Sequence, residues 1–223
     1  MKEDKKIKKE QFIIESAERV FEKVGFKNAK MDDIAAAAGI TKVTLYSYFQ
    51  SKENLYLAIT YNALSALNEV YLQTIKNNET NSGMVCTLAL LETFMDFCEK
   101  HYFYSEVLLE YFALIRSTSA GKNADKMTDA AKDSAYYHKL QELHNLPFKW
   151  TVREIERGKK DGSIRTNLDS MLCTLHGWTV VIGYVKILSA SGDNATPLFK
   201  VNLKELKKVH LKMAEIMFGV DIL

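Results

Sequence analysis

The chain has 223 residues, which is enough to bury one large hydrophobic core or two smaller ones. Hydrophobic residues make up 47% of it and charged residues 26%, as in soluble globular proteins. No stretch approaches the roughly 18 to 20 uncharged apolar residues that cross a bilayer, and the charged N-terminus lacks the apolar run of a signal peptide. We therefore expect a cytoplasmic protein without a membrane partner.

The cysteines also favour a cytoplasmic location. Cys86, Cys98 and Cys173 are an odd number, lie far apart and form no CxxC pair. This usage favours reduced thiols, each a small core residue.

The basic charge is concentrated at the N-terminus. Residues 1–60 contain 11 Lys and Arg against 9 Asp and Glu, whereas the rest of the chain contains 19 of each. The N-terminal cluster consists of Lys2, Lys5, Lys6, Lys8 and Lys9. Such a cluster suits an arm that binds phosphates, although a solvated, frayed terminus explains the charge equally well.

Apolar periodicity predicts a first helix over residues 8–24, followed by Gly25 as a left-handed C-cap. Its predicted apolar stripe is Phe12, Ile13, Ala17, Val20, Phe21 and Val24. A second, short helix is expected over 32–38, with two aspartates at its positive end. Gly39 ends that helix, and Thr41 is suited to cap a third helix over 42–49.

Helix also dominates the rest of the chain. Ser51 is expected to cap a long helix over 52–75, and the polar segment 77–83 follows it as a break. Further helices are predicted over 84–100, 103–117, 127–160, 168–190 and 202–218. Pro147 should kink or divide the third of these, and 117–125 is the expected mobile loop. The predicted class is all-α, with about nine helices.

The segment from residue 31 to 55 has the plan of a helix-turn-helix, in which Gly39-Ile40-Thr41 forms the turn. At 100° per residue, Leu45 and Phe49 face the core against Ile34 and Ala38. Val43 and Ser47 then point outward. They are flanked by Thr44 and Tyr46, and Lys42 can reach a guanine edge or a phosphate.

The start of the fourth helix predicts a phosphate contact. Ser51-Lys52-Glu53 brings free backbone amides and an ammonium group to one helix N-terminus, and both attract an anion. Tyr48, nearby, can donate a phenolic hydrogen bond to a DNA phosphate. Contacts of this kind fix orientation while the third helix reads the bases.

These residues carry a resemblance to a known family. The motifs are Gly25-Phe26, Asp33-Ile34-Ala35, Ala38-Gly39-Ile40-Thr41, Leu45-Tyr46-Ser47-Tyr48-Phe49 and Ser51-Lys52 with Leu55. In this order, residues 8–60 resemble the DNA-binding domain of the TetR family of repressors. The resemblance implies groove contacts by Lys42, Val43, Thr44 and Tyr46, and phosphate contacts by Tyr48 and Lys52. The full predicted DNA-contacting set is Lys30, Thr41, Lys42, Val43, Thr44, Tyr46, Ser47, Tyr48 and Lys52.

One position departs from the family pattern, which usually has Ser or Thr before the second helix. Lys30 stands there and cannot N-cap, at a cost of about 1 kcal/mol, although its charge can still serve a phosphate. Asn28 is the nearest side chain that could cap instead. The alternative for the whole segment is a small helical subdomain that does not contact DNA.

The last two helices, 168–190 and 202–218, are the predicted homodimer interface, a four-helix contact across a two-fold axis. Each helix has a stripe of residues that recur at three- and four-residue steps. The stripe of the first helix is Leu172, Leu175, Thr179, Ile182, Gly183, Lys186 and Ile187. The stripe of the second is Leu203, Leu206, Val209 or His210, Met213, Ile216 or Met217 and Val220. Gly177 and Gly183 would let another helix approach closely. The alternative is that both stripes serve the chain's own core.

Aromatic residues are dense between 84 and 178, and the family resemblance implies an effector cavity there. The predicted ligand-binding residues are Phe94, Phe97, Cys98, Tyr111, Tyr137, Trp150 and Trp178. They suit an apolar or aromatic effector, or a cationic one if Glu92 or Glu110 faces it. For any single residue, core packing is the competing explanation.

No catalytic motif or cofactor signature is present, and the five histidines form no metal-ligand spacing, so we expect neither an enzyme nor a metal or cofactor. The predicted domains are residues 1–52, which bind DNA, and 53–223, which bind effector and dimerise. The favoured function is a dimeric repressor that binds a palindromic operator in double-stranded DNA and is released by a small effector. Activation of transcription, or action through a protein partner, is the alternative.

Overall fold

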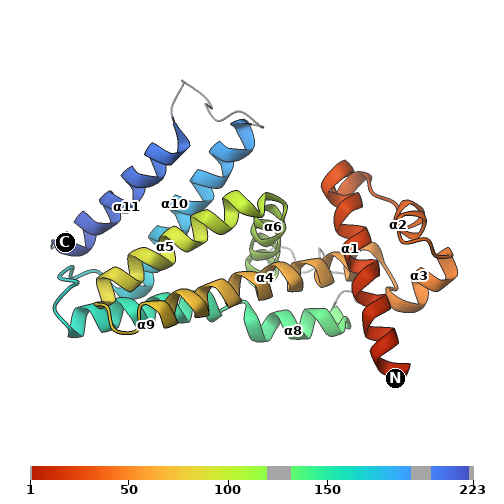
Figure 1. The fold of residues 1–223 in the computed structure, drawn as a ribbon, viewed down its shortest axis with the longest axis horizontal. Helices are drawn as coiled ribbons and strands as arrows, with labels where there is room; N and C mark the ends of the chain where they lie inside the picture. Colours follow the sequence, from red (N-terminus) through yellow and green to blue (C-terminus); the bar gives the residue numbers. More distant parts are fainter. Residues whose placement is uncertain (1, 120–131, 192–201, 221–223) are drawn as a thin grey trace. The chain divides into compact units, whose positions relative to one another are not determined.

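A computed structural model describes residues 2–119, 132–191 and 202–220 of the chain, which are helical throughout apart from their connections. The all-α prediction is confirmed. The helices are α1 (Lys2–Asn28), α2 (Met31–Ala37), α3 (Lys42–Tyr48), α4 (Lys52–Asn77), α5 (Gly83–Lys100), α6 (Tyr102–Ser119), α8 (Ala135–Leu143), α9 (Leu146–Lys160), α10 (Ser170–Ser191) and α11 (Leu203–Gly219) (Figure 1).

The predicted helix over 127–160 is divided, as its proline suggested. Pro147 lies in the first turn of α9, where its missing N–H and fixed φ are tolerated, and α8 ends before it at Leu143. Residues 127–131 and most of the expected loop, 120–125, lie outside the described residues. The first part of that loop, 117–119, is the last turn of α6.

The chain packs as two compact units, each made of two segments. Unit 1 is Met1–Leu64 with Glu106–Leu143, and unit 2 is Ser65–Ser105 with His144–Leu223. This differs from the single boundary expected after residue 52, because α4 and α6 each supply residues to both units.

Two tyrosine–carboxylate hydrogen bonds show why the second segment belongs to unit 1. Tyr56 of α4 donates to Glu110 of α6 at 2.5 Å, and Tyr136 of α8 donates to Glu10 of α1 at 2.7 Å. The ring of Tyr136 also stacks on Phe49, with centroids 6.3 Å apart. Unit 1 therefore combines the three N-terminal helices with parts of α4 and α6 and the whole of α8.

The core of the N-terminal helices lies between α1, α2 and α3. Ile13, Ile14 and Phe21 of α1 are buried, whereas Phe12 and Val24 of the predicted stripe are exposed. The basic N-terminal cluster continues α1 to Lys2 rather than preceding it.

In unit 2, α5 packs against α9, α10 and α11. The crossing of α5 and α9 is close because two glycines meet there. A Cβ atom on Gly83 would lie 2.0 Å from the Gly158 nitrogen, so nothing larger fits without moving the backbone.

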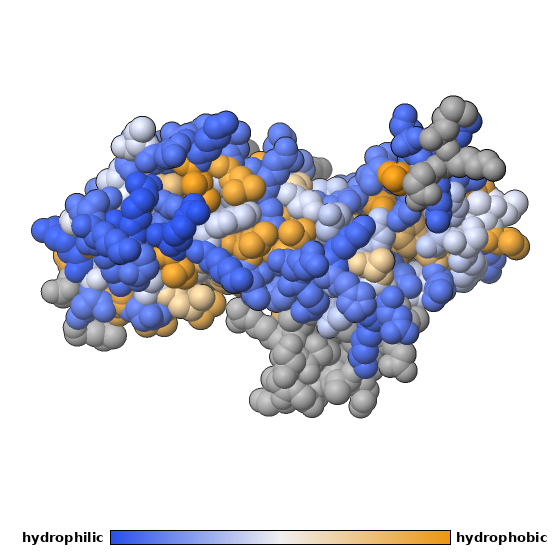
Figure 2. Space-filling view, turned by 90° about the horizontal axis from the view of Figure 1, so that it is seen from below, coloured by the Kyte–Doolittle hydropathy of each residue, from blue (hydrophilic) through white to orange (hydrophobic). Residues whose placement is uncertain are grey.

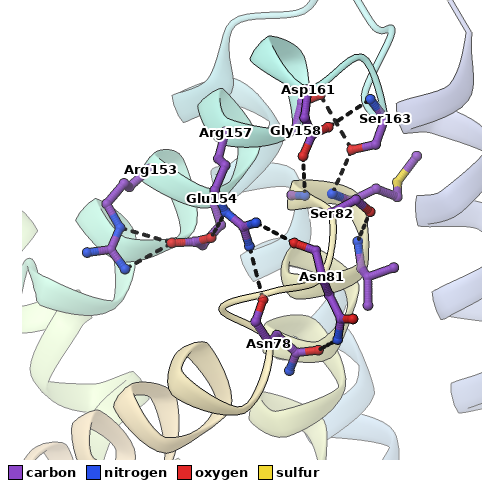
Figure 3. A network of polar contacts seen from close by, with 12 residues as sticks. Asn78, Asn81, Ser82, Arg153, Glu154, Arg157, Gly158, Asp161 and Ser163 are labelled. Atoms are coloured by element: carbon purple, nitrogen blue, oxygen red, sulfur yellow. Dashed lines mark hydrogen bonds and ion pairs between the residues drawn. The ribbon is translucent and has the colours of Figure 1, made fainter.

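A polar network joins the same two helices (Figure 3). Glu154, buried on α9, accepts from Arg153 at 2.9 Å and from Arg157 at 2.7 Å. Burial alone would raise the pKa of Glu154, but the bonds and charges of Arg157 and Arg153 outweigh it and hold that pKa below its ordinary value. This carboxylate is therefore ionised and paired inside the fold.

The network continues into the turn between α4 and α5. Arg157 donates to the carbonyl of Asn81 at 2.5 Å, and Asp161 accepts from the Gly83 amide at 2.7 Å. These partners stand 76 and 78 residues apart in the chain. The network thus fixes the C-terminal end of α9 against the start of α5.

By length and apolar composition alone, α10 could cross a membrane over Ser170–Ala190, which the sequence expectation had discounted. In unit 2 this helix packs against α5, α9 and α11, and a soluble core helix passes the same test. Its apolar side chains are not confined to the side that meets those neighbours: Cys173 and Val181 are buried, but Met171 and Leu172 are exposed. A helix that is apolar on several sides requires a further partner.

Candidate nucleic-acid interface and ligand cavity

The turn between α2 and α3 has the predicted geometry. Gly39 adopts φ 61°, a left-handed conformation that glycine reaches without strain, and its amide donates to Ala36 at 3.1 Å. The Thr41 hydroxyl then caps α3 by accepting from the Thr44 amide at 3.1 Å. The cap and the turn together fix the angle at which α3 leaves α2.

The sides of α3 are those predicted from the helical wheel. Leu45 and Phe49 are buried with Ile34 and Ala38. On the outer side Val43 is 81% exposed, and Tyr46 and Ser47 are also exposed. A β-branched apolar side chain this exposed contributes nothing to the core of the single chain, which leaves α3 with an outward face free for a partner.

Lys42 is bound to a neighbour on α2. Its ammonium lies 2.7 Å from the Asp32 carboxylate, with both side chains more than half exposed. The hydrogen bond and charge of Asp32 raise the pKa of Lys42. A phosphate or guanine that takes Lys42 must therefore compete with Asp32.

Lys52 makes contacts that the sequence analysis missed. Its Nζ donates to the backbone carbonyls of Phe26 at 2.7 Å, Ala29 at 3.0 Å and Lys27 at 3.4 Å. It also lies 4.5 Å from the centroid of the Phe26 ring. Because an ammonium group has three N–H donors, these bonds use all of them. Lys52 thereby ties the start of α4 to the end of α1, and a phosphate could take its Nζ only by displacing one of these carbonyls.

The start of α2 lacks a side-chain cap, as the sequence predicted. Lys30 stands at the N-cap with extended backbone and makes no capping hydrogen bond. Asn28 does not replace it, since its Nδ2 donates back to the Val24 carbonyl at 3.0 Å. Lys30 is exposed. The phosphate-contacting roles of Lys30 and Tyr48 remain predictions.

Unit 2 contains a cavity of about 570 Å³, within the range of small-molecule sites. Of the seven predicted ligand-binding residues, Phe94 and Trp178 line it. Phe97, Cys98 and Trp150 belong to the same unit but do not line the cavity, and Tyr111 and Tyr137 belong to unit 1. These five do not line this cavity, and their ligand-binding role stays a prediction. Aromatic density alone could not show which helix faces meet.

The cavity walls include residues that the sequence analysis did not select, among them Tyr71, Thr87, Thr151, His176, His210 and Met213. Among the residues that the structure describes, no Lys, Arg, Asp or Glu lines the cavity, and Glu92 and Glu110 are not part of its wall. Burial lowers the pKa of His210, which favours the neutral imidazole. The site suits an uncharged, apolar ligand.

One polar group in this wall has no internal partner. The Thr87 hydroxyl is buried and lacks a hydrogen bond within the described part of the chain. Leaving such a group unpaired costs about 1–3 kcal/mol, so a ligand with one polar atom opposite Thr87 would gain from meeting it.

The predicted dimer stripe on α11 is exposed. Val209, Met213, Ile216 and Val220 recur at three- and four-residue steps and are between 48% and 60% exposed. On α10, a Cβ atom on Gly183 would meet nothing within 4 Å, whereas one on Gly177 would contact Leu91 of the same chain at 3.8 Å. Of the two glycines, only Gly183 is open to another helix. Figure 2, which shows the molecule from below, has apolar patches within a largely hydrophilic surface.

Potential metal ligands form no cluster in the described ranges. No group of three or more His, Cys, Asp or Glu side chains there could hold a metal ion. The three cysteines are free and buried.

The glycine turn after α2, the capped α3 and its outward face form a helix-turn-helix motif. Residues 13–59, which contain these features, match the model of the bacterial regulatory proteins of the TetR family. Over these residues the chain is similar to that family, and the match covers less than a quarter of its length. The matched model describes regulatory proteins, and the expectation of a non-enzymatic protein stays a prediction for the chain as a whole.

Relatives resemble part of the chain in sequence and nearly all of it in fold. The chain is 35% identical over 87 residues to the transcriptional activator FasR of Mycolicibacterium smegmatis, a match that spans only 39% of either protein. The TetR-family regulator PfmR of Thermus thermophilus shares 17% identity and a TM-score of 0.66 over 92% of this chain and 97% of its own. FadR of Bacillus subtilis, solved with stearoyl-CoA, shares 16% identity and a TM-score of 0.63 over 94% and 98%. These last two likenesses show the fold alone.

Proposed function

We propose that the chain is a cytoplasmic transcriptional regulator that binds a palindromic operator in double-stranded DNA as a homodimer. The outward face of α3 carries the proposal, above all Val43, which is 81% exposed beside exposed Tyr46 and Ser47. Small, hydroxyl-bearing and aromatic side chains on one side of such a helix suit a major groove. The cap at Thr41 and the buried Leu45 hold that side outward.

Dimerisation follows from the size of one module. A seven-residue α3 touches too few bases for useful specificity, so two copies must read two half-sites. The exposed apolar stripe of α11 and the exposed part of α10 supply a self-complementary surface for a two-fold dimer. The family resemblance supports the same arrangement.

The proposed effector is an uncharged apolar molecule, or an apolar chain whose charged head stays outside the cavity. The described walls offer hydroxyls and the imidazole of His210, whose pKa burial lowers, but no Lys or Arg to neutralise a carboxylate or phosphate. FadR, which shares this fold, was solved with stearoyl-CoA, whose long chain has the required character. In this proposal the regulator bound to its operator represses transcription, and effector binding releases the operator.

The coupling element in this proposal is α4. Lys52 stands at its first residue and Tyr71, which lines the cavity, stands 19 residues later, about 28 Å along the helix. A ligand that shifts Tyr71 can tilt α4 as a rigid rod. The tilt would move the joint that Lys52 holds at the end of α1.

DNA binding is tested by anisotropy or gel shift on the DNA upstream of the chain's own coding sequence. We expect a sequence-preferring complex whose affinity falls as salt rises, because Lys and Arg release counterions from phosphates. Val43→Asp should abolish the complex without changing the melting temperature. Val43→Asp protein that keeps full regulatory activity would instead favour action through a protein partner.

Activation is the second candidate, because FasR, the relative with 35% identity, is an activator. A reporter gene behind the bound DNA distinguishes the two directions. Deletion of the regulator should raise expression if it represses and lower expression if it activates.

A further inference from the structure

The wall of the unit 2 cavity and the exposed stripe of α11 share residues. Met213, Ile216 and Val220 line the cavity, yet each is about half exposed in the single chain. On α10, Leu172 also does both. The same apolar side chains therefore face a ligand site and the outside of the chain, so one side of this site is open to solvent.

An open apolar wall is a poor place for an apolar ligand, because part of the ligand would remain in water. The other walls, from α5 and α9, are well buried: Phe94 and Ile155 are 5% and 0% exposed. The buried Thr87 hydroxyl without a partner indicates that the inner wall is built for an occupant. Within the described part of the chain, the exposed side of the cavity is the one formed by α10 and α11.

A second copy of this chain fits that side better than a different protein. The stripe Val209, Met213, Ile216 and Val220 carries no charge, so it can face its own image across a two-fold axis without repulsion. The nearby cation Lys207 is turned to Asp96 on α5, where it forms an ion pair, and is largely buried. Gly183 leaves room on α10 for close approach by a partner helix.

We infer that a second copy of the chain closes the cavity, so that the ligand site is completed across the dimer interface and ligand binding and dimerisation strengthen each other. The inference rests on the proposed homodimer. By linkage, a ligand that contacts both copies tightens the dimer by the same factor by which dimerisation tightens the ligand. Separation of the two chains should therefore weaken ligand binding, even when no residue of the cavity is altered.

Two substitutions break the interface without touching the cavity. Val209 belongs to the stripe but does not line the cavity, and Val209→Asp places a charge in an apolar contact. Gly183→Asp adds a side chain whose first atom meets nothing within its own chain. Lys204→Asp is the control, because it introduces the same side chain at an exposed position about 140° round α11 from Val209.

The probe is N-phenyl-1-naphthylamine, an uncharged apolar fluorophore, titrated into full-length protein whose mass is followed by analytical ultracentrifugation. We expect wild type and Lys204→Asp to be dimers that bind the probe, with the probe lowering the dimer dissociation constant. Val209→Asp and Gly183→Asp should be folded monomers that bind it at least tenfold more weakly. Two substitutions on different helices keep the test valid if one of them fails to fold.

A folded monomeric variant with wild-type probe affinity would overturn the inference, as would variants that stay dimeric or a wild type that binds no probe. DNA binding is measured separately. If the probe strengthens the wild-type dimer but the wild-type protein binds no DNA, the proposed function alone would be overturned. If the wild-type protein binds its operator but the probe does not change its dimer dissociation constant, this inference alone would be overturned.

Discussion

The three N-terminal helices and unit 2 are built by different means. The turn and cap between α2 and α3 depend on hydrogen bonds between residues at most five positions apart, such as Ile40 to Ala35. Unit 2 depends on contacts between residues nearly 80 positions apart, such as Gly83 to Asp161. Short-range hydrogen bonds of the first kind correspond to a recognisable sequence motif. Long-range contacts of the second kind are indicated in the sequence only by the apolar faces of the helices. Consistently, the family model matches residues 13–59 and none of unit 2.

The close helix crossing in unit 2 offers the largest test of this contrast. Gly83→Ala should destabilise the protein by about 3 kcal/mol or more, because its Cβ would overlap the backbone of Gly158. Denaturant unfolding measures the loss. Gly177→Ala is the control, since its Cβ makes only an ordinary contact with Leu91 at 3.8 Å and should be neutral or slightly stabilising. Equal effects of the two substitutions would contradict the described crossing.

The buried carboxylate should have the next largest effect. Glu154→Gln should cost about 2 kcal/mol at pH 7, because two arginines lose their charged partner. Since the pKa of Glu154 is lowered on folding, its contribution is complete above the ordinary value of 4.5 and is lost as the pH falls through the lower folded value. The difference between wild type and Glu154→Gln should therefore shrink below about pH 4.

Denaturant unfolding between pH 3 and pH 7 measures that difference. Glu156→Gln is the control, because Glu156 is exposed on the same helix. A difference between wild type and Glu154→Gln that stays constant across this range would argue against an ionised, paired Glu154.

Lys52 tests whether the N-terminal helices also depend on a distant contact. Lys52→Met keeps the aliphatic chain but removes the bonds to three carbonyls, and should lower stability by about 1–2 kcal/mol. Lys30→Met, at an exposed lysine without a capping bond, should weaken DNA binding and leave the melting temperature unchanged. If Lys52→Met instead lost DNA affinity at full stability, the phosphate contact predicted from the sequence would be its main role.

The smallest expected effect concerns Asp32. Asp32→Asn frees Lys42 and removes a negative charge from the outward side, so DNA affinity should rise by about two- to fivefold at low salt. Asp33→Asn removes the same charge without releasing Lys42 and should have a smaller effect. Both are read by anisotropy against wild type, and equal gains would mean that the ion pair does not restrain Lys42.

The sequence predicted most helices of this fold to within a few residues, because apolar period, Gly39, Thr41 and Pro147 are local signals. It also predicted which side of α3 is buried. The extension of α1 to Lys2 was missed, since charged residues carry no apolar period. So was the role of Lys52, whose carbonyl partners lie more than 20 residues away.

The cavity could be predicted only in part. Phe94 and Trp178 were expected, but Tyr71, Thr87 and Met213 were not, because a helical stripe does not reveal which stripe it will meet. The last two helices were expected to form the dimer surface, and their exposed apolar residues agree with that expectation. That some of these residues also line the cavity depends on the packing of α10 and α11 over α5, which no local pattern contains.

A footprint of the wild-type protein on its own upstream DNA tests the central claim most directly, with Val43→Asp alongside. We predict two protected half-sites related by a two-fold axis and spaced by a whole number of helical turns. Val43→Asp should lose both while keeping the dimer mass and melting temperature of wild type, because Val43 is exposed and supports no core. Protection by Val43→Asp equal to that of wild type, or no sequence-preferring protection at all, would contradict the account.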